Sequence, residues 1–300
     1  MDAAVELVDL KKSYRDNLVL GGINLSVRRG QIVSILGPNG AGKTTTLEII
    51  EGQRTPSSGR VRTLGLDPFS RAGFSQLRRQ IGVALQSSSF EPKLSVKEMI
   101  DRQKSYYTEV VAVDPLVEAL ALGKYWNTRT GALSEGTRQR LNVLLALVGN
   151  PELVLLDEPT AGLDPASRLA VTALIESLSE HGMTVLLSSH HLDEVENLAS
   201  EVVVLRDGAI RAAGSPQALL ESARVPTHIE FHALGNVGEL PAGADIDADL
   251  VRYQTCDPDL LLAQIRAWED GRRNELTRLN VARPTLNDAY VALIGEGVSR

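Results

Sequence analysis

A glycine-rich stretch offers the clearest chemistry in the chain. It fits the pattern G-x-x-x-x-G-K-[ST] without a mismatch and reads Gly37-Pro38-Asn39-Gly40-Ala41-Gly42-Lys43-Thr44-Thr45. Glycines let such a loop curl until successive backbone N–H groups face one anion. Lys43 adds a mobile positive charge for the terminal phosphates, and the Thr44 hydroxyl can ligate Mg²⁺. The stretch therefore predicts a site for the phosphates of a nucleotide.

Two carboxylates follow a second apolar run, which covers residues 153–156. If this run is a buried strand, Asp157 lies at the carboxyl edge of a sheet, where ligands of α/β proteins bind. We expect Asp157 to hold Mg²⁺ and Glu158 to polarise an attacking water as general base. The alternative is a strand that happens to end in two exposed acids.

The segments around these residues are those that a phosphate site requires. Residues 31–36 form an apolar run typical of a buried strand, and residues 44–50 predict a helix whose N-terminus points at the phosphates. Helical character is predicted from about residue 95 to about residue 122. Further strands are predicted at 5–9, 18–27, 81–85, 153–157, 184–188, 201–205 and 209–212. Residues 1–222 therefore predict an α/β domain with a helical subdomain at about 87–150.

The pattern of apolar residues restarts after about residue 226. Strands are predicted at 227–233, 250–255 and 275–282, and helices at 258–268 and 285–294. Residues 241–249 are rich in Pro, Gly and Asp and predict a loop. Residues 227–300 are therefore expected to form a small C-terminal accessory α+β module.

Composition narrows the function classes. The chain has 300 residues and a mean hydropathy of −0.05. Its net charge of −7 and its pI near 5.4 argue against nucleic acid as a partner. Cys256 is the single cysteine and suits a reducing cytoplasm. The N-terminus is acidic where a signal peptide is basic, and no uncharged apolar run approaches the roughly 18–20 residues of a membrane span. We expect a chain that does not itself cross a membrane.

Further motifs occur in a fixed order with the phosphate loop. Gln86 follows the predicted strand at 81–85, and Tyr14 precedes the loop. Three more motifs are Asp157-Glu158-Pro159-Thr160, Ala161-Gly162-Leu163-Asp164 and Ser188-Ser189-His190. Over nearly all of residues 5–222 the chain resembles the ATP-binding subunits of ATP-binding-cassette (ABC) transporters. The resemblance implies a P-loop NTPase cassette fold that binds ATP and Mg²⁺.

The resemblance implies a role for each matched residue. Tyr14 would stack on adenine, Gln86 would touch Mg²⁺ or the attacking water, and His190 would donate to the γ-phosphate. Asp164 belongs to the D-loop and also suits the N-cap of a helix. His191 is expected at the surface instead, because adjacent side chains diverge. The predicted catalytic residues are Glu158, His190, Gln86 and Lys43, and the predicted metal ligands are Thr44, Asp157 and Gln86.

The signature motif of the family departs from its usual form, Leu-Ser-Gly-Gly-Gln. Here it reads Leu133-Ser134-Glu135-Gly136-Thr137. In the family it faces the γ-phosphate held by the other subunit, which implies two chains that sandwich two ATPs head to tail. Ser134 and Gly136 keep a hydroxyl and a close N–H for that role. A carboxylate at Glu135 that pointed at phosphates would weaken binding, so an ATP-binding module with weak hydrolysis is an alternative.

The end of the chain suggests which transporters are relevant. Residues 283–293 resemble the Pro-Thr-Leu-Glu-Asp-Val-Phe-type ending of ATPase subunits from efflux systems of the daunorubicin-resistance kind, although Asn287 and Ala289 differ. The resemblance implies an ATP-hydrolysing subunit of a bacterial exporter of drugs, antibiotics or other small molecules. It would lie at the cytoplasmic face of the membrane, where a separate transmembrane permease docks near Gln86 and residues 87–125.

A second alternative comes from another class of cassette protein, soluble or regulatory and not coupled to transport. Soluble cassette proteins that act on ribosomes or DNA usually carry tandem cassettes or long coiled coils, and this sequence has neither. The transported substrate is not encoded in these residues, because the permease supplies its pocket.

Overall fold

The computed structural model describes residues 3–15, 17–85, 90–234, 240–270 and 275–295. Contacts divide the chain into two compact units, Met1–Pro216 and Gln217–Arg300. The predicted site residue Gln86 lies outside the described residues.

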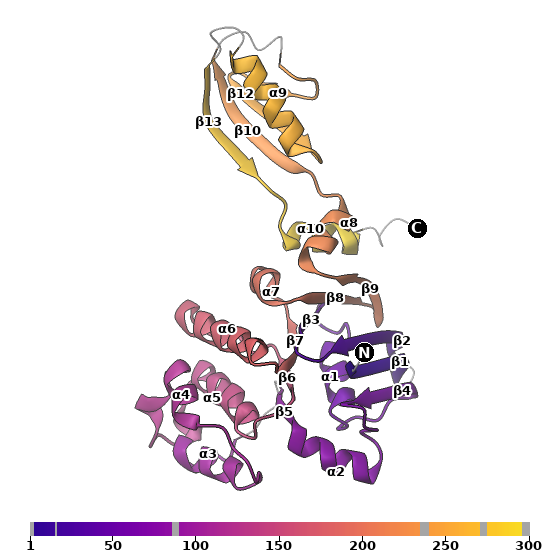
Figure 1. Ribbon diagram of the computed structural model, residues 1–300, viewed down its shortest axis with the longest axis vertical. Coiled ribbons are helices and arrows are strands. Elements are labelled where there is room, and N and C mark those ends of the chain that lie inside the picture. Colours follow the sequence, from indigo (N-terminus) through magenta and orange to yellow (C-terminus); the bar gives the residue numbers. More distant parts are fainter. Residues whose placement is uncertain (1–2, 16, 86–89, 235–239, 271–274, 296–300) are drawn as a thin grey trace. The chain divides into compact units, whose positions relative to one another are not determined.

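The first unit is built on a six-stranded sheet in the order β5-β6-β7-β3-β8-β9 (Figure 1). All neighbours pair in parallel except β8 and β9. The strands are β3 (Ile32–Leu36), β5 (Ile81–Ala84), β6 (Leu153–Asp157), β7 (Thr184–Ser189), β8 (Glu201–Arg206) and β9 (Ala209–Gly214). Every residue of β3, β6 and β7 is buried, as expected for parallel strands covered on both faces.

The register of the central strands gathers three motifs at one edge of this sheet. Leu36 pairs with Ser189, and Asp157 pairs with Ser188. The carboxyl ends of β3, β6 and β7 therefore lie side by side. The phosphate loop, the two carboxylates and the histidine segment begin at these ends.

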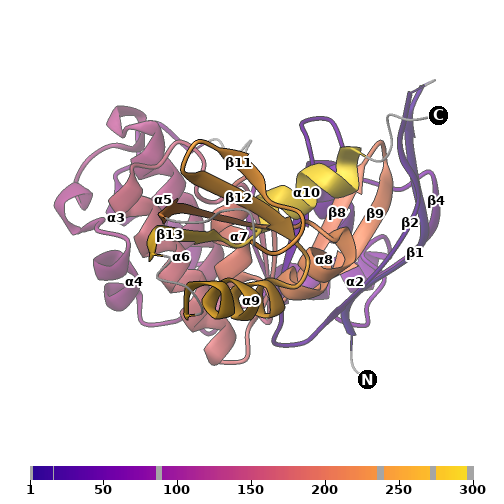
Figure 2. The same ribbon diagram turned by 90° about the horizontal axis from the view of Figure 1, so that it is seen from above.

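A helical segment and a small antiparallel sheet flank the central strands on opposite sides (Figures 1 and 2). The small sheet has the order β2-β1-β4, with β1 (Ala3–Tyr14), β2 (Asn17–Arg28) and β4 (Ser58–Thr63). The helical segment holds α3 (Val96–Lys104), α4 (Val113–Ala119), α5 (Glu135–Leu147) and two 3₁₀ turns, Gly123–Tyr125 and Thr130–Ala132. A capping box of Ser95 and Glu98 starts α3. The helical character predicted to about residue 122 is interrupted between α3 and α4.

The remaining helices of the first unit connect its strands. They are α1 (Lys43–Ile50), α2 (Arg71–Gln80), α6 (Pro165–Glu180) and α7 (Leu192–Leu198). The small sheet packs on α1 through one apolar cluster that includes Leu7, Leu20, Ile35, Leu47 and Ile50. Each such buried side chain contributes about 1.5–3 kcal/mol, so α1 is firmly held behind the phosphate loop.

Three elements of this unit were not predicted, namely β4, α2 and α7. Strand β4 begins in a segment that reads as a turn, and it pairs with β1 through Val5, Leu7 and their neighbours. Helix α2 is mostly polar and buries only Gly73 and Leu77, so few apolar residues mark it in the sequence. Ser70 caps α2 by accepting from the Gly73 N–H at 3.1 Å.

The second unit is a four-stranded antiparallel sheet in the order β11-β12-β10-β13 with a helix packed on it (Figure 1). Its elements are β10 (Thr227–Leu234), β11 (Asp245–Asp247), β12 (Leu250–Thr255), α9 (Pro258–Asp270), β13 (Glu275–Ala282) and α10 (Leu286–Gly295), with α8 (Pro216–Ala223) at its start. Ile265 and Trp268 of α9 share a core with Phe231 and Tyr253. The loop predicted at 241–249 is wrong in part, because β11 pairs there with β12.

Within the described part of the chain, no helix combines the length and the low polarity that crossing a bilayer requires.

Candidate nucleotide site

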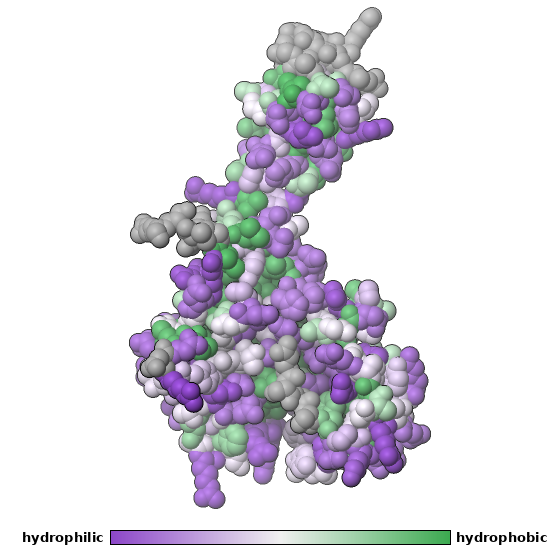
Figure 3. Space-filling model, turned by 180° about the vertical axis from the view of Figure 1, so that it is seen from behind, coloured by the Kyte–Doolittle hydropathy of each residue, from purple (hydrophilic) through white to green (hydrophobic). Residues whose placement is uncertain are grey.

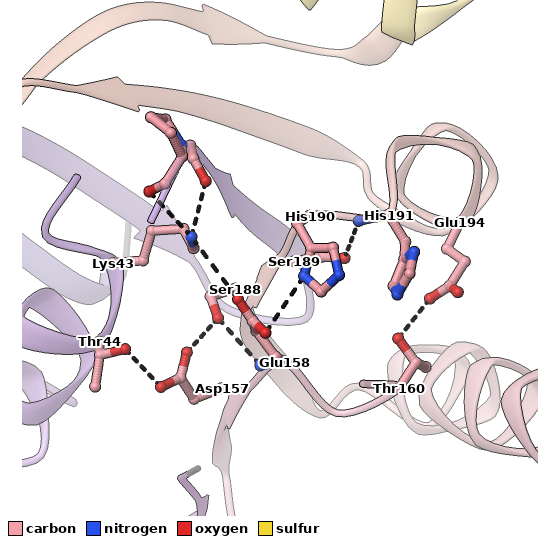
Figure 4. A network of polar contacts seen from close by, with 12 residues as sticks. Lys43, Thr44, Asp157, Glu158, Thr160, Ser188, Ser189, His190, His191 and Glu194 are labelled. Carbon is pink, nitrogen blue, oxygen red and sulfur yellow. Dashed lines mark hydrogen bonds and ion pairs between the residues drawn. The ribbon is translucent and has the colours of Figure 1, made fainter. Parts of the chain in front are cut away.

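The Lys43 ammonium lies at the centre of the candidate site (Figure 4). It donates to the Gly37 carbonyl at 2.8 Å, and its side chain is only 6% exposed. The loop turns tightly, because a Cβ on Gly37 would meet the Leu205 carbonyl oxygen at 2.2 Å. Gly42 precedes the helix with a φ of 106°, a region that favours glycine. A buried cation thus sits at the first residue of α1, where the helix dipole also favours an anion.

Asp157 is buried at the end of β6, and both of its carboxylate oxygens accept hydrogen bonds. The Thr44 hydroxyl donates to Oδ2 at 2.7 Å, and the Ser188 hydroxyl donates to Oδ1. Hydroxyl and carboxylate oxygens are the hard donors that Mg²⁺ prefers. Thr44 and Asp157 therefore fit the predicted metal site. Among the described residues, no three His, Cys, Asp or Glu side chains are placed to hold a metal ion together, so phosphate oxygens and water would complete the shell.

Glu158 adopts a strained backbone that its neighbours hold in place. Its φ is 50°, in the left-handed region that costs a non-glycine residue about 1 kcal/mol or more. Its N–H lies 3.1 Å from both the carbonyl and the hydroxyl oxygen of Ser188, and its carbonyl accepts from Gln139 Nε2 at 3.2 Å. These bonds fix where the carboxylate points.

The Glu158 carboxylate lies between two cationic or potentially cationic groups (Figure 4). Oε1 is 3.8 Å from Lys43 Nζ, and Oε2 is 3.3 Å from His190 Nδ1. The predicted catalytic residues Lys43, Glu158 and His190 are therefore brought together. A carboxylate held in this way can accept a proton from a water bound beside the phosphates.

The two adjacent histidines contact each other, so the expectation that their side chains diverge is wrong, although His191 keeps part of its side chain at the surface. Their ring centroids are 4.1 Å apart. The His190 side chain is 49% exposed, whereas His191 is half-buried. Burial, and next the charge of His190, lower the pKa of His191. The His191 N–H donates to Ser189 Oγ at 2.9 Å, which turns the chain into α7 and keeps the rings together.

The altered signature forms a well-capped start for α5. Ser134 Oγ accepts from the Thr137 N–H at 3.3 Å and lies 2.9 Å from the Thr137 hydroxyl. Arg140 donates to the same hydroxyl at 3.3 Å, so buried Thr137 stabilises the helix start. A Cβ on Gly136 would lie 3.3 Å from the Gly162 carbonyl. The signature therefore packs closely against the D-loop of its own chain.

The other predicted residues take the following positions. Tyr14 is 37% exposed, with Lys12 Nζ 5.0 Å and Arg54 Cζ 5.2 Å from its ring centre. Asp164 caps α6 by accepting from the Ser167 N–H at 3.0 Å, and its hydrogen bonds to Ser167 lower the pKa of Asp164. The adenine role of Tyr14 and the role of Gln86 stay predictions.

Two residues of the site, Ser188 and Gln139, were not given a role from the sequence. Ser188 links Asp157 and Glu158, and its signal was a hydroxyl at the end of a strand predicted to be buried. Gln139 bridges α5 and Glu158, but nothing in its sequence position indicated that bond.

Known proteins resemble this chain over most of its length. A family model described as ABC transporter matches residues 20–161. The Nod factor export ATP-binding protein I of Rhizobium sp. (strain N33) is 31% identical over 99% of both chains. The protein of the same name from Burkholderia orbicola (strain AU 1054) is 33% identical over 98% of this chain and 97% of its own.

Two solved structures extend the comparison to the fold. An ATP-binding subunit of an ABC transporter, 27% identical, has a TM-score of 0.68 and covers 73% of this chain and 92% of its own. A dimeric ATP-binding cassette in a post-hydrolysis state with ADP and Pi, 26% identical, has a TM-score of 0.63 and covers 70% of this chain and 98% of its own.

Fold, site and comparisons together define a P-loop ATPase that binds ATP. The chain belongs to the ATP-binding subunits of the ABC transporter family. The cassette fold and the ATP binding expected from the sequence are confirmed.

Proposed function

We propose that this chain is the ATP-hydrolysing subunit of a bacterial exporter. The arrangement of Glu158 between Lys43 and His190, beside Asp157, carries the proposal. Hydrolysis needs a base, a phosphate clamp and a metal site within one small volume, and these residues provide all three. The likeness to two Nod factor export proteins over almost the whole chain supports the direction of transport.

Each residue has a part in the reaction. Loop N–H groups and Lys43 bind the β- and γ-phosphates, while Tyr14 provides a ring for the adenine. Thr44 and Asp157 would hold Mg²⁺, which would supply positive charge to neutralise the phosphates. Glu158 accepts a proton from the attacking water, and His190 donates a hydrogen bond to the γ-phosphate.

Two copies of the chain would complete two sites. Ser134 and Gly136 at the start of α5, with Asp164, would face the ATP bound by the partner copy in a head-to-tail pair. The dimeric cassette with ADP and Pi supports this arrangement. ATP would favour the closed pair and hydrolysis would release it, which drives the transport subunit.

That transport subunit would be a separate transmembrane permease, and the cassette would lie at the cytoplasmic face of the membrane. The C-terminal sequence at 283–293 supports efflux of drugs, antibiotics or other small molecules.

ATP turnover by the purified chain tests the proposal. Glu158→Gln should lower kcat by about 10²–10⁴-fold, because it removes the general base. Glu6→Gln, on an exposed strand position, is the matched control and should keep wild-type turnover. Equal turnover of Glu158→Gln and wild type, alone and with the membrane subunit, would contradict the role of Glu158.

A further inference from the structure

His191 is a titratable residue beside the site, and the reaction proposed above gives it no part. Its ring is tilted by 38° to the His190 ring, with 4.1 Å between the two ring centres (Figure 4). The bond from the His191 N–H to Ser189 Oγ holds the backbone in the turn that brings the rings together. The His191 ring therefore limits the positions that the His190 ring can take.

The charged groups next to His191 lie partly inside the first unit. Figure 3 shows hydrophilic residues over much of the face that it draws, as expected where charged groups meet water. Glu194 of α7 is instead only 16% exposed, and its Oε2 accepts from the Thr160 hydroxyl at 2.8 Å. Its Oε1 lies 3.1 Å from Arg168 Nε of α6. These contacts anchor α7 and so fix His191, which is the residue directly before that helix.

The surroundings keep His191 neutral at pH 7. Burial, and next the charge of His190, lower the pKa of His191 below its ordinary value of 6.5. Arg168 acts in the same direction, whereas Glu194 and Glu158 raise this pKa. Since the lowering effects are larger, His191 takes up a proton only in acid solution.

His190 has two acceptors to serve during the reaction. Its Nδ1 lies 3.3 Å from Glu158 Oε2, which leaves Nε2 for the γ-phosphate. A neutral imidazole carries one N–H, whereas an imidazolium carries two. His190 therefore donates to both acceptors only in its charged form. The ring of His191 beside it must then be neutral, because two positive charges at this distance repel each other.

We propose that His191 is a positioning residue: its neutral ring holds the charged His190 ring between Glu158 and the γ-phosphate, and a proton on His191 disrupts this arrangement. The inference rests on the proposed function, because it takes His190 as the donor to the γ-phosphate. A neutral aromatic ring attracts a neighbouring cation, whereas a charged ring repels it. ATP turnover should therefore fall as the solution becomes acid.

Two substitutions of His191 separate the effect of the ring from the effect of its proton. His191→Ala removes the ring and should lower kcat of the purified chain about tenfold at pH 7.5, with an unchanged KM for ATP. His191→Phe keeps a ring without a titratable nitrogen and should restore most of that loss. The ratio of kcat at pH 7.5 to kcat at pH 5 should be about fivefold larger for wild type than for His191→Phe. His181→Phe, exposed at the end of α6, is the control and should match wild type in both measurements.

The outcomes distinguish the inference from the proposed function. Equal pH profiles of kcat for wild type and His191→Phe would overturn the inference, and so would unchanged kcat in His191→Ala. A raised KM with unchanged kcat in His191→Ala would also overturn it, since His191 would then act in nucleotide binding. If His191→Ala does not fold, the pH profile of His191→Phe decides alone. Wild-type turnover by His190→Ala would contradict the proposed function itself.

Discussion

Asp157 and Glu51 are both acidic residues in the interior of the first unit, near opposite ends of α1, and their surroundings differ sharply. Asp157 has a hydroxyl donor on each oxygen. Glu51 has an oxygen without a partner and a pKa raised to about 7 by burial. Hydroxyl groups of the same chain thus hold the Asp157 carboxylate in a position that suits a cation. The Glu51 carboxyl has no donor on its Oε2 oxygen among the described residues.

The largest effect on ATP turnover should come from a substitution of Asp157. Asp157→Asn should lower ATP turnover at least about 10²-fold, because an amide in place of the carboxylate removes several kcal/mol of metal-assisted stabilisation. Steady-state turnover at increasing Mg²⁺ measures it. Asp101→Asn, exposed on α3, is the control. ATP turnover of Asp157→Asn within threefold of wild type would contradict a role for Asp157 in metal binding, and with it the contrast to Glu51.

The unpartnered carboxylate should instead affect stability. Burial raises the pKa of Glu51 to about 7 in the folded chain, so its proton is held up to about that pH, whereas the unfolded chain loses it near pH 4.5. The contribution of protonated Glu51 to the free energy of unfolding is therefore fully present below pH 4.5. It is lost as the pH rises through about 7. Glu51→Gln should therefore gain ~3 kcal/mol in unfolding free energy at pH 8 relative to its effect at pH 4.5.

Denaturant unfolding across this pH range measures the gain, and Glu6→Gln should show no comparable trend. A Glu51→Gln gain that is independent of pH would mean that the carboxyl is not strained by burial.

The next largest effect should come from Gln139, which donates a hydrogen bond to the Glu158 carbonyl. Gln139→Met removes the donor to the Glu158 carbonyl while keeping a similar length. We expect kcat to fall about fivefold with an unchanged KM, since one hydrogen bond of ~1 kcal/mol no longer positions the base. Gln139→Asn, which is one methylene shorter, should not rescue turnover. A change in KM alone would place Gln139 in nucleotide binding instead.

The smallest effect should come from a third carboxylate, Glu135. It lies in the first turn of α5, where the helix dipole favours it. Glu135→Gly should therefore change turnover less than about threefold. A tenfold rise in turnover would support the alternative of a cassette weakened by its altered signature.

The position of Asp157 in the site could be predicted from the sequence, whereas the buried environment of Glu51 could not. Asp157 ends a run of apolar residues, and strand pairing then sets its neighbours. The environment of Glu51 depends on α2, which buries only Gly73 and Leu77 and so offers few apolar residues from which to predict it. His191 shows the same limit, because its contact with His190 depends on a turn that spacing does not encode.

The left-handed backbone at Glu158 has a consequence for sequence variation within related chains. Glycine would relieve the strain at this position, and asparagine tolerates the same backbone better than glutamate does. Random substitution without selection for catalysis would therefore drift toward those residues and leave the cassette fold intact. Glutamate at a φ of 50° thus places the proposed base at a position where glycine would make the fold more stable.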